Sequence, residues 1–370
     1  MMWLIIAALV LLASGGGFVY LTAGFHRFGF MRELDKKSKI ASWVLSAAAI
    51  ALIGGIWGLI NIWSVMIVLI HLFFFWLGAD AVSAFIARCR KKKPKRNYAG
   101  ASALFITTIY LAIGWFLAHA VVQTDYGLRT DKNIGKDGMR IALIADSHIG
   151  ITLDGGEFAR EMKRINADEP DMVIVAGDFV DDDSRRRDMV EACAALGSIK
   201  TKYGVFYSLG NHDEGYFDGG RDFTIDDVIS ELEKNGVTVL MDEAVMVDEN
   251  ICVIGRKDRS EEISGGRKTM AELTAGMSPE SYKIVIDHQP NDYAAEAAGG
   301  ADLVLSGHTH GGHIFPAGYI GVLIGANDRA YGTERRDATD FVVTSGISGW
   351  AIPFKTGCKS EYVIIDVEEN

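Results

Sequence analysis

The second half of the chain carries five short motifs built from side chains that bind catalytic metal ions. In chain order they are Asp146-Ser147-His148, Gly177-Asp178, Gly210-Asn211-His212-Asp213, His288 and Gly307-His308-Thr309-His310. Carboxylate oxygens, imidazole nitrogens and an amide oxygen suit Mn, Fe or Zn in a catalytic site, and no cysteine accompanies them. The inventory is large enough to hold two ions side by side, which indicates a metal-dependent hydrolase.

Each motif directly follows an apolar run that predicts a β-strand. These runs are residues 141–145, 173–176, 206–209, 284–286 and 303–305. Because ligands of open α/β sheets gather at the carboxyl ends of the strands, we expect the five motifs to converge there. Residues two apart in an extended chain point to the same side, so Asp146 and His148 can share one ion. For the same reason His308 and His310 can both face the cluster.

The elements around these strands predict a layered α/β domain with a mixed sheet over residues 139–370. Helices are predicted at residues 158–167, 189–199 and 225–234, and further strands at 237–240, 244–247, 251–254, 341–344 and 362–366. Strands alternate with helices at first, and strands dominate later. The polar, glycine-containing residues 123–138 predict a linker in front of this domain.

The first part of the chain predicts a membrane bundle. Residues 1–25, 40–79 and 99–122 form three stretches without a charged side chain. A helix needs about 20 apolar residues to cross a bilayer, so the middle stretch fits two spans with a break near Asn61. We therefore expect an N-terminal all-α transmembrane bundle of four helices within residues 1–122. The first stretch lacks the basic start of a cleaved signal peptide and is counted as a span.

Charge divides the chain in the same place. Residues 1–121 hold 12 Lys and Arg against 3 Asp and Glu, whereas the remainder holds 25 against 45. The run 88–96, between the third and fourth predicted spans, carries seven positive charges. Basic loops stay in the cytoplasm, so four spans place both ends and the acidic domain on the extracytoplasmic side. The acidic domain also argues against nucleic acid as the main partner.

The ordered motifs resemble those of the calcineurin-like metallophosphoesterases over roughly residues 139–370. The longer string from Leu305 to Pro316 is similar to that of the bacterial membrane-anchored branch, as are residues 255–258 and 287–290. The resemblance implies an αββα sandwich of mixed sheets in an integral protein of the bacterial cell membrane. His313 stands where that branch usually has Gln, and Lys355 where we expect Arg. These two departures concern substrate contacts, not the metal site.

The resemblance also implies a role for each motif residue. The first divalent ion would be held by Asp146, His148, Asp178 and His310, and the second by Asp178, Asn211, His288 and His308, with Asp178 bridging. His212 would protonate the leaving oxygen, and Asp213 would orient His212. A hydroxide bridging two Mn, Fe or Zn ions would attack phosphorus in line. Asp181, Asp182 and Asp183 are interpreted as a solvated loop.

These observations predict a membrane-anchored, dinuclear phosphoesterase. Its expected substrates are phosphodiesters or phosphates linked to a lipid or to the cell envelope. One alternative is a pyrophosphatase of the UDP-diacylglucosamine type in lipid A precursor metabolism, whose substrates are cytoplasmic and so conflict with the predicted topology. A second alternative is a non-catalytic membrane scaffold, against which the complete set of ligand residues argues.

Overall fold

The computed structural model describes residues 2–92, 94–216 and 220–370 and divides into two compact units, Met1–Ile113 and Gly114–Asn370. The first unit consists of helices α1 (Met2–His26), α2 (Gly29–Asp35), α3 (Lys39–Gly58), α4 (Ile62–Arg90) and most of α5 (Tyr98–His119). Within the part searched, α3, α4 and α5 are long and apolar enough to cross a membrane. The first predicted span falls in α1, where the side chains of residues 2–13 lie outside the described part.

The helical unit separates its spans as the sequence predicts. A break follows α3, and Asn61 caps α4 by accepting a hydrogen bond from Ser64 N at 2.8 Å. A small apolar core joins four helices through Leu21, Ile50, Leu72, Trp76 and Ala103. Most other large apolar side chains of these helices face outward, as a lipid-facing surface requires.

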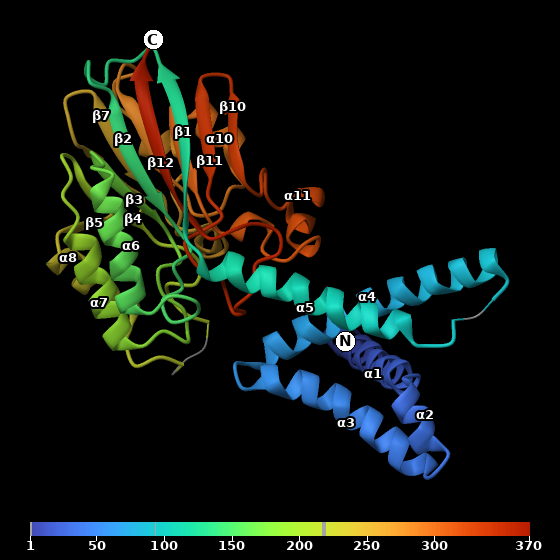
Figure 1. The fold of residues 1–370 in the computed structure, drawn as a ribbon. Helices are drawn as coiled ribbons and strands as arrows, with labels where there is room; N and C mark the ends of the chain where they lie inside the picture. Colours follow the sequence, from blue (N-terminus) through green and yellow to red (C-terminus); the bar gives the residue numbers. More distant parts are fainter. Residues whose placement is uncertain (1, 93, 217–219) are drawn as a thin grey trace. The chain divides into compact units, whose positions relative to one another are not determined.

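The second unit is a domain of two mixed six-stranded sheets (Figure 1). The first sheet has the order β1 (Val122–Thr130), β12 (Glu361–Glu369), β2 (Met139–Ile144), β3 (Met172–Ala176), β4 (Gly204–Ser208), β5 (Val237–Val239). The second has the order β10 (Gly332–Arg336), β11 (Thr339–Val343), β9 (Leu303–Ser306), β8 (Tyr282–Ile286), β7 (Ile251–Gly255), β6 (Glu243–Met246). Strands β2 to β5 run parallel, as do β7, β8, β9 and β11.

Alternating side chains of the strands build three apolar layers. Ile141 and Leu143 of β2 point into the core between the sheets, and Ala142 and Ile144 point to the opposite face. That outer face packs against α6 (Gly155–Ala167), α7 (Arg186–Gly197) and α8 (Ile225–Lys234), the helices coloured from green to yellow in Figure 1. The outer face of the second sheet packs against two helices that the sequence analysis does not predict, α9 (Met270–Leu273) and α10 (Tyr293–Ala298).

The predicted linker is wrong for its first half, because residues 122–130 form strand β1. This strand pairs in parallel with β12 over nine residues. Tyr126 and Leu128 pack against the core between the sheets, while Gln123 and Asp125 lie on the other side of the strand. A polar edge strand that buries only alternate residues has too weak an apolar signal to be distinguished from a linker.

The last turns of α5 also belong to the second unit. The Lys355 N–H donates to Gly114 O at 2.9 Å, and the Ser360 N–H donates to Leu117 O at 2.8 Å. The ring of Trp115 contacts the ring of Phe354 edge-on, with 6.0 Å between ring centroids. The folded domain therefore begins inside α5, well before the predicted boundary at residue 139.

Candidate metal centre

The seven predicted metal ligands lie on five loops that follow strands of both sheets. Loops after β2, β3 and β4 carry ligands from the first sheet, and loops after β8 and β9 carry ligands from the second. The structure brings six of these side chains into two groups of three potential ligand atoms, and the atoms of each group lie within 4.8 Å of one another. The convergence expected from the strand ends is present, and it joins the two sheets at one site.

The first group contains Asp146, His148 and His310, all buried. The Nε2 atoms of His148 and His310 face each other at 3.2 Å, and His310 Nε2 lies 3.8 Å from Asp146 Oδ1. The His308 N–H donates to both oxygens of Asp146, at 2.9 and 3.1 Å, which fixes the orientation of that carboxylate.

The second group contains Asp178, His288 and His308. Asp178 Oδ2 lies 3.0 Å from His288 Nε2 and 3.7 Å from His148 Nε2, so it stands between the two groups. Asn211 joins the second group, since its Oδ1 lies 2.9 Å from His308 Nδ1. Asp178 thus approaches histidines of both groups, and which of these residues bind metal stays a prediction.

The backbone at the ligands is strained. Five non-glycine residues adopt left-handed φ angles: Asp146 (52°), His148 (36°), Asp178 (53°), His308 (69°) and His310 (49°). Such conformations cost about 1–3 kcal/mol each and persist where the surrounding structure enforces them. Two glycines permit the close packing. A Cβ on Gly177 would lie 2.6 Å from His288 Nδ1, and one on Gly307 would lie 2.7 Å from Asp146 Oδ2.

Asp181 belongs to the site, although the sequence analysis interprets it as part of a solvated loop. Its side chain is buried, with Oδ2 3.0 Å from His148 Nδ1 and Oδ1 3.5 Å from His212 Nδ1. The spacing Gly177-Asp178-x-x-Asp181 carries this signal, but the same spacing is common in turns.

The sequence analysis expects Asp213 to orient the ring of His212. In the structure, Asp213 instead contacts the backbone of the site. Its carboxylate accepts hydrogen bonds from the N–H groups of Asp178, Phe179, Val180 and Gly210, at 2.7–3.2 Å. It thereby holds the two loops after β3 and β4 together. The carboxylate that faces the His212 ring is that of Asp181.

Burial and neighbouring charge set the protonation of the site. Burial raises the pKa of Asp146 to about 6. Burial also opposes ionisation of Asp178, but the nearby imidazoles of His288 and His148 outweigh it and hold the pKa of Asp178 below its usual value. Burial alone would lower the pKa of His212, but the carboxylates of Asp181 and Asp178 raise it. His212 is therefore disposed to hold a proton.

The chemistry of the two groups fits divalent cations. Ligand atoms bound at about 2.0–2.2 Å in a tetrahedral site lie roughly 3.3–3.6 Å apart, and the separations given above bracket that range. His288 Nε2 is buried and makes no hydrogen bond to another described residue, although it lies 3.0 Å from a carboxylate oxygen. That contact suits two ligands of one ion better than a hydrogen-bonded pair.

The two departures from the bacterial branch lie beside the first group. The ring of His313 stacks on that of His310 with 5.1 Å between centroids, and burial lowers the pKa of His313 to about 3. The buried Lys355 Nζ donates to the carbonyl groups of Ser345 and Gly346, and burial lowers its pKa to about 8. The Lys355 ammonium group thus stabilises the loop that contains Ser345 and Gly346.

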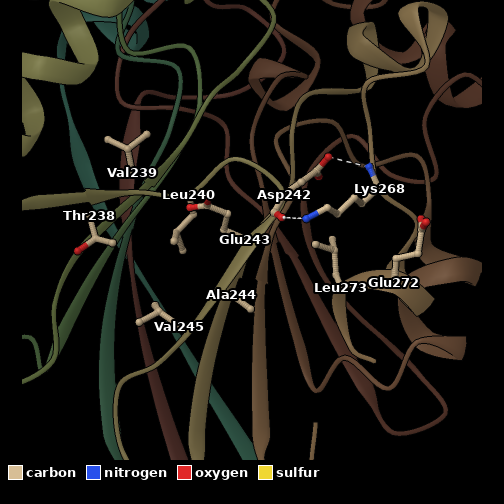
Figure 2. Close-up of a pocket in the computed structure, with 10 residues that line it drawn as sticks. All are labelled: Thr238, Val239, Leu240, Asp242, Glu243, Ala244, Val245, Lys268, Glu272 and Leu273. Atoms are coloured by element: carbon tan, nitrogen blue, oxygen red, sulfur yellow. Dashed lines mark hydrogen bonds between the residues drawn. The ribbon is translucent and has the colours of Figure 1, made fainter. Parts of the chain in front are cut away.

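The domain also contains a cavity, shown in Figure 2, that is separate from the predicted metal ligands. Its volume is about 460 Å³, and its lining comes from the edge strands β5 and β6 and from residues near α9. At its wall, the Lys268 N–H donates a hydrogen bond to Asp242 Oδ2 at 2.6 Å. None of the predicted metal ligands lines this cavity.

Sequence comparisons with known proteins agree with the geometry. Residues 139–312 match the family model of the calcineurin-like phosphoesterases. An uncharacterized metallophosphoesterase of Campylobacter jejuni is 27% identical over 317 residues, 80% of this chain and 78% of that protein. A transmembrane protein with metallophosphoesterase domain from Bos taurus is 28% identical over 61% of this chain and 52% of that protein. A dimetal phosphatase structure from Danio rerio aligns with a TM-score of 0.37 at 12% identity, covering 57% and 87% of the two chains.

The second unit is therefore a metallophosphoesterase domain of the calcineurin-like superfamily with intact metal-binding clusters. The chain spans about half the length of the bovine relative that it matches. That relative is a transmembrane protein, and this chain has three helices long and apolar enough to span a membrane.

Proposed function

We propose that this protein is a membrane-anchored, dinuclear phosphodiesterase whose substrates carry their phosphate on a lipid or on another component of the cell envelope. The observation that carries the proposal is Asp178, which stands between two groups of buried ligand-type side chains. One carboxylate shared by two such groups is the arrangement that a pair of ions needs.

The proposed ligands are those expected from the sequence. Asp146, His148, Asp178 and His310 hold one ion, and Asp178, Asn211, His288 and His308 hold the other. Two divalent ions supply positive charge for the phosphoryl oxygens and lower the pKa of a coordinated water, and Mn, Fe and Zn all accept these donors.

Other side chains prepare the leaving group and the substrate. His212 holds a proton at the edge of the site and gives it to the departing oxygen. The ring of Tyr216 packs edge-on to that of His212 with 4.9 Å between centroids, and the ring of Trp350 is tilted against it at 5.2 Å. Both aromatic rings are exposed, so they border His212 where substrate can reach it.

The membrane part anchors the enzyme and orients it. The proposed bundle has four spans, with the basic run 88–96 in the cytoplasm and the catalytic domain outside. An external domain disfavours a pyrophosphatase of cytoplasmic UDP-diacylglucosamine, the alternative that the sequence leaves open. The scaffold alternative is disfavoured because the ligand groups are complete.

The test uses the full chain, purified in detergent and stripped of metal. Hydrolysis of bis-p-nitrophenyl phosphate and p-nitrophenyl phosphate is measured after adding Mn, Zn, Fe or Mg in turn. We expect metal-dependent turnover that favours the diester and falls by more than about 100-fold in Asp178→Asn. Faster turnover of the monoester would reject the phosphodiesterase assignment. A metal-loaded protein without any turnover would reject both substrate classes.

A further inference from the structure

The helical unit contains a cavity of its own where α1, α2, α4 and α5 end or begin. Its volume is about 820 Å³. Arg27 and Asp80 line one part, and the remaining cationic lining consists of Arg32, Arg88, Lys91, Lys92, Lys95 and Arg96. The metallophosphoesterase site contributes no residue to it, so the cavity is a separate feature of the protein.

The charge of this cavity is unbalanced. Among the described residues, Asp80 is the single acidic one of the lining, and it already accepts hydrogen bonds from Arg27 NH2 and Tyr20 OH, each at 2.6 Å. Within the described residues, the other six lining cations make no ion pair with an acid. Positive charges gathered around one hollow repel one another, and a bound anion would relieve that repulsion.

Backbone geometry adds to the positive potential. The 22-residue helix α5 begins at the cavity wall, where Asn97 caps it by accepting a hydrogen bond from Gly100 N at 3.0 Å. The positive end of its helix dipole therefore faces the same region as the cations. Arg27 Nε is buried and makes no hydrogen bond to another described residue, so one guanidinium donor at this wall remains available.

We infer that this cavity binds a phosphate group, of the kind carried by an anionic lipid headgroup or by free phosphate. Arginine forks and lysine ammonium groups are the side chains that bind phosphate best. The lipid is the favoured source because Ala84 and Ala87 of α4 and Ala99 of α5 line the same cavity. Basic pockets at the ends of membrane helices bind phospholipid headgroups on this principle.

The experiment measures retention of dioleoyl phosphatidylglycerol by the full chain in uncharged detergent, using native mass spectrometry during a lipid titration. The variant Arg88→Gln/Lys92→Gln/Arg96→Gln removes three lining cations. The control, Lys37→Gln/Lys39→Gln/Arg90→Gln, removes the same number of cations from positions that do not line the cavity, two at or just before the start of α3 and one at the end of α4. Dioleoyl phosphatidylcholine and inorganic phosphate serve as competing probes.

We expect the cavity variant to bind phosphatidylglycerol at least about 10-fold more weakly, while the control variant stays within about twofold of the parent chain. Equal losses in both variants would overturn the inference, because the lipid would then respond only to overall charge. Equal binding of phosphatidylcholine would overturn it as well. Displacement of the lipid by millimolar inorganic phosphate would support the phosphate site and name free phosphate as its source.

Both variants should keep the diester hydrolysis of the parent chain, because no catalytic candidate lies in the cavity. Circular dichroism of each variant in the same detergent shows that its helices are folded. The lipid measurement does not depend on hydrolysis, so a failure of the proposed enzymatic function leaves this test intact.

Discussion

At the scale of single residues, Asp181 lies between a proposed metal ligand and the proposed acid. Its Oδ2 lies 3.0 Å from His148 Nδ1 and its Oδ1 lies 3.5 Å from His212 Nδ1, and its charge raises the pKa of His212 against the effect of burial. Carboxylates that support a metal-bound histidine fix its tautomer and increase its basicity.

Replacing Asp181→Asn should lower both metal affinity and diester hydrolysis by about 10–100-fold. The exposed neighbour Asp183 provides the control, since Asp183→Asn removes the same charge two residues away without a contact to either histidine. Metal content by mass spectrometry and kcat/KM for bis-p-nitrophenyl phosphate distinguish the two variants. Equal activity and equal metal content of the two variants would show that Asp181 has no role in the proposed site.

Metal binding should strengthen as the pH rises through about 6, the pKa to which burial raises Asp146. Below that pH the carboxyl group is protonated, and an ion binds only after the proton leaves, which costs up to about tenfold in affinity per pH unit. We expect His288 to release a second proton when metal binds, because the carboxylate of Asp178 raises the pKa of His288 against the opposing effect of burial. Calorimetry of the stripped protein in buffers with different ionisation enthalpies should detect proton release. Affinity independent of pH would contradict this account.

At the scale of secondary structure, the two sheets locate the site by their strand ends, and β1 completes the first sheet. Without β1, the long strand β12 would become an open edge, and Tyr126 and Leu128 would no longer cover the core. Unpaired edges of this length favour aggregation.

A chain that starts at Asp131 should therefore be less stable than one that starts at Gly114. The expected loss is on the order of 2 kcal/mol or more, from the side chains that β1 buries. Urea unfolding followed by circular dichroism measures the difference. Unchanged stability of the shorter chain would show that β1 is an accessory strand.

The sequence predicts most of the fold that positions the site, and the misses have physical reasons. Buried strands such as β3 are apolar throughout, and the predicted run 173–176 falls within the observed strand Met172–Ala176. Strand β1 is missed because half of its side chains face solvent. The site is predicted from strand ends, but Asp181 is missed because only tertiary contacts distinguish a buried carboxylate from an exposed one. The contacts of Asp213 depend on backbone geometry that no motif encodes.

At the scale of the whole molecule, the basic helical unit and the acidic catalytic unit have opposite charge, and the basic loops set the proposed orientation. Cys89 lies exposed in the basic run, while Cys193 and Cys252 are buried. The chain therefore carries a natural thiol on the side of the membrane proposed to be cytoplasmic.

In intact cells, a membrane-impermeant maleimide should label Glu249→Cys, at an exposed hairpin turn of the domain, without labelling Cys89. Cys89 should react only after the membrane is permeabilised. Cys358 is half-buried, so a background with Cys89→Ser and Cys358→Ser assigns the domain signal to position 249. The reverse pattern would place the domain in the cytoplasm and restore the pyrophosphatase alternative.

The left-handed backbone at five ligand residues has an evolutionary consequence. Glycine at any of these positions would relieve the backbone strain, because it accepts such φ angles without a steric cost, and would remove the proposed ligand atom in the same step. A copy of this gene released from selection for catalysis could therefore accept glycine at the site itself. Aspartate and histidine at all five positions carry a strain that only the proposed chemistry requires.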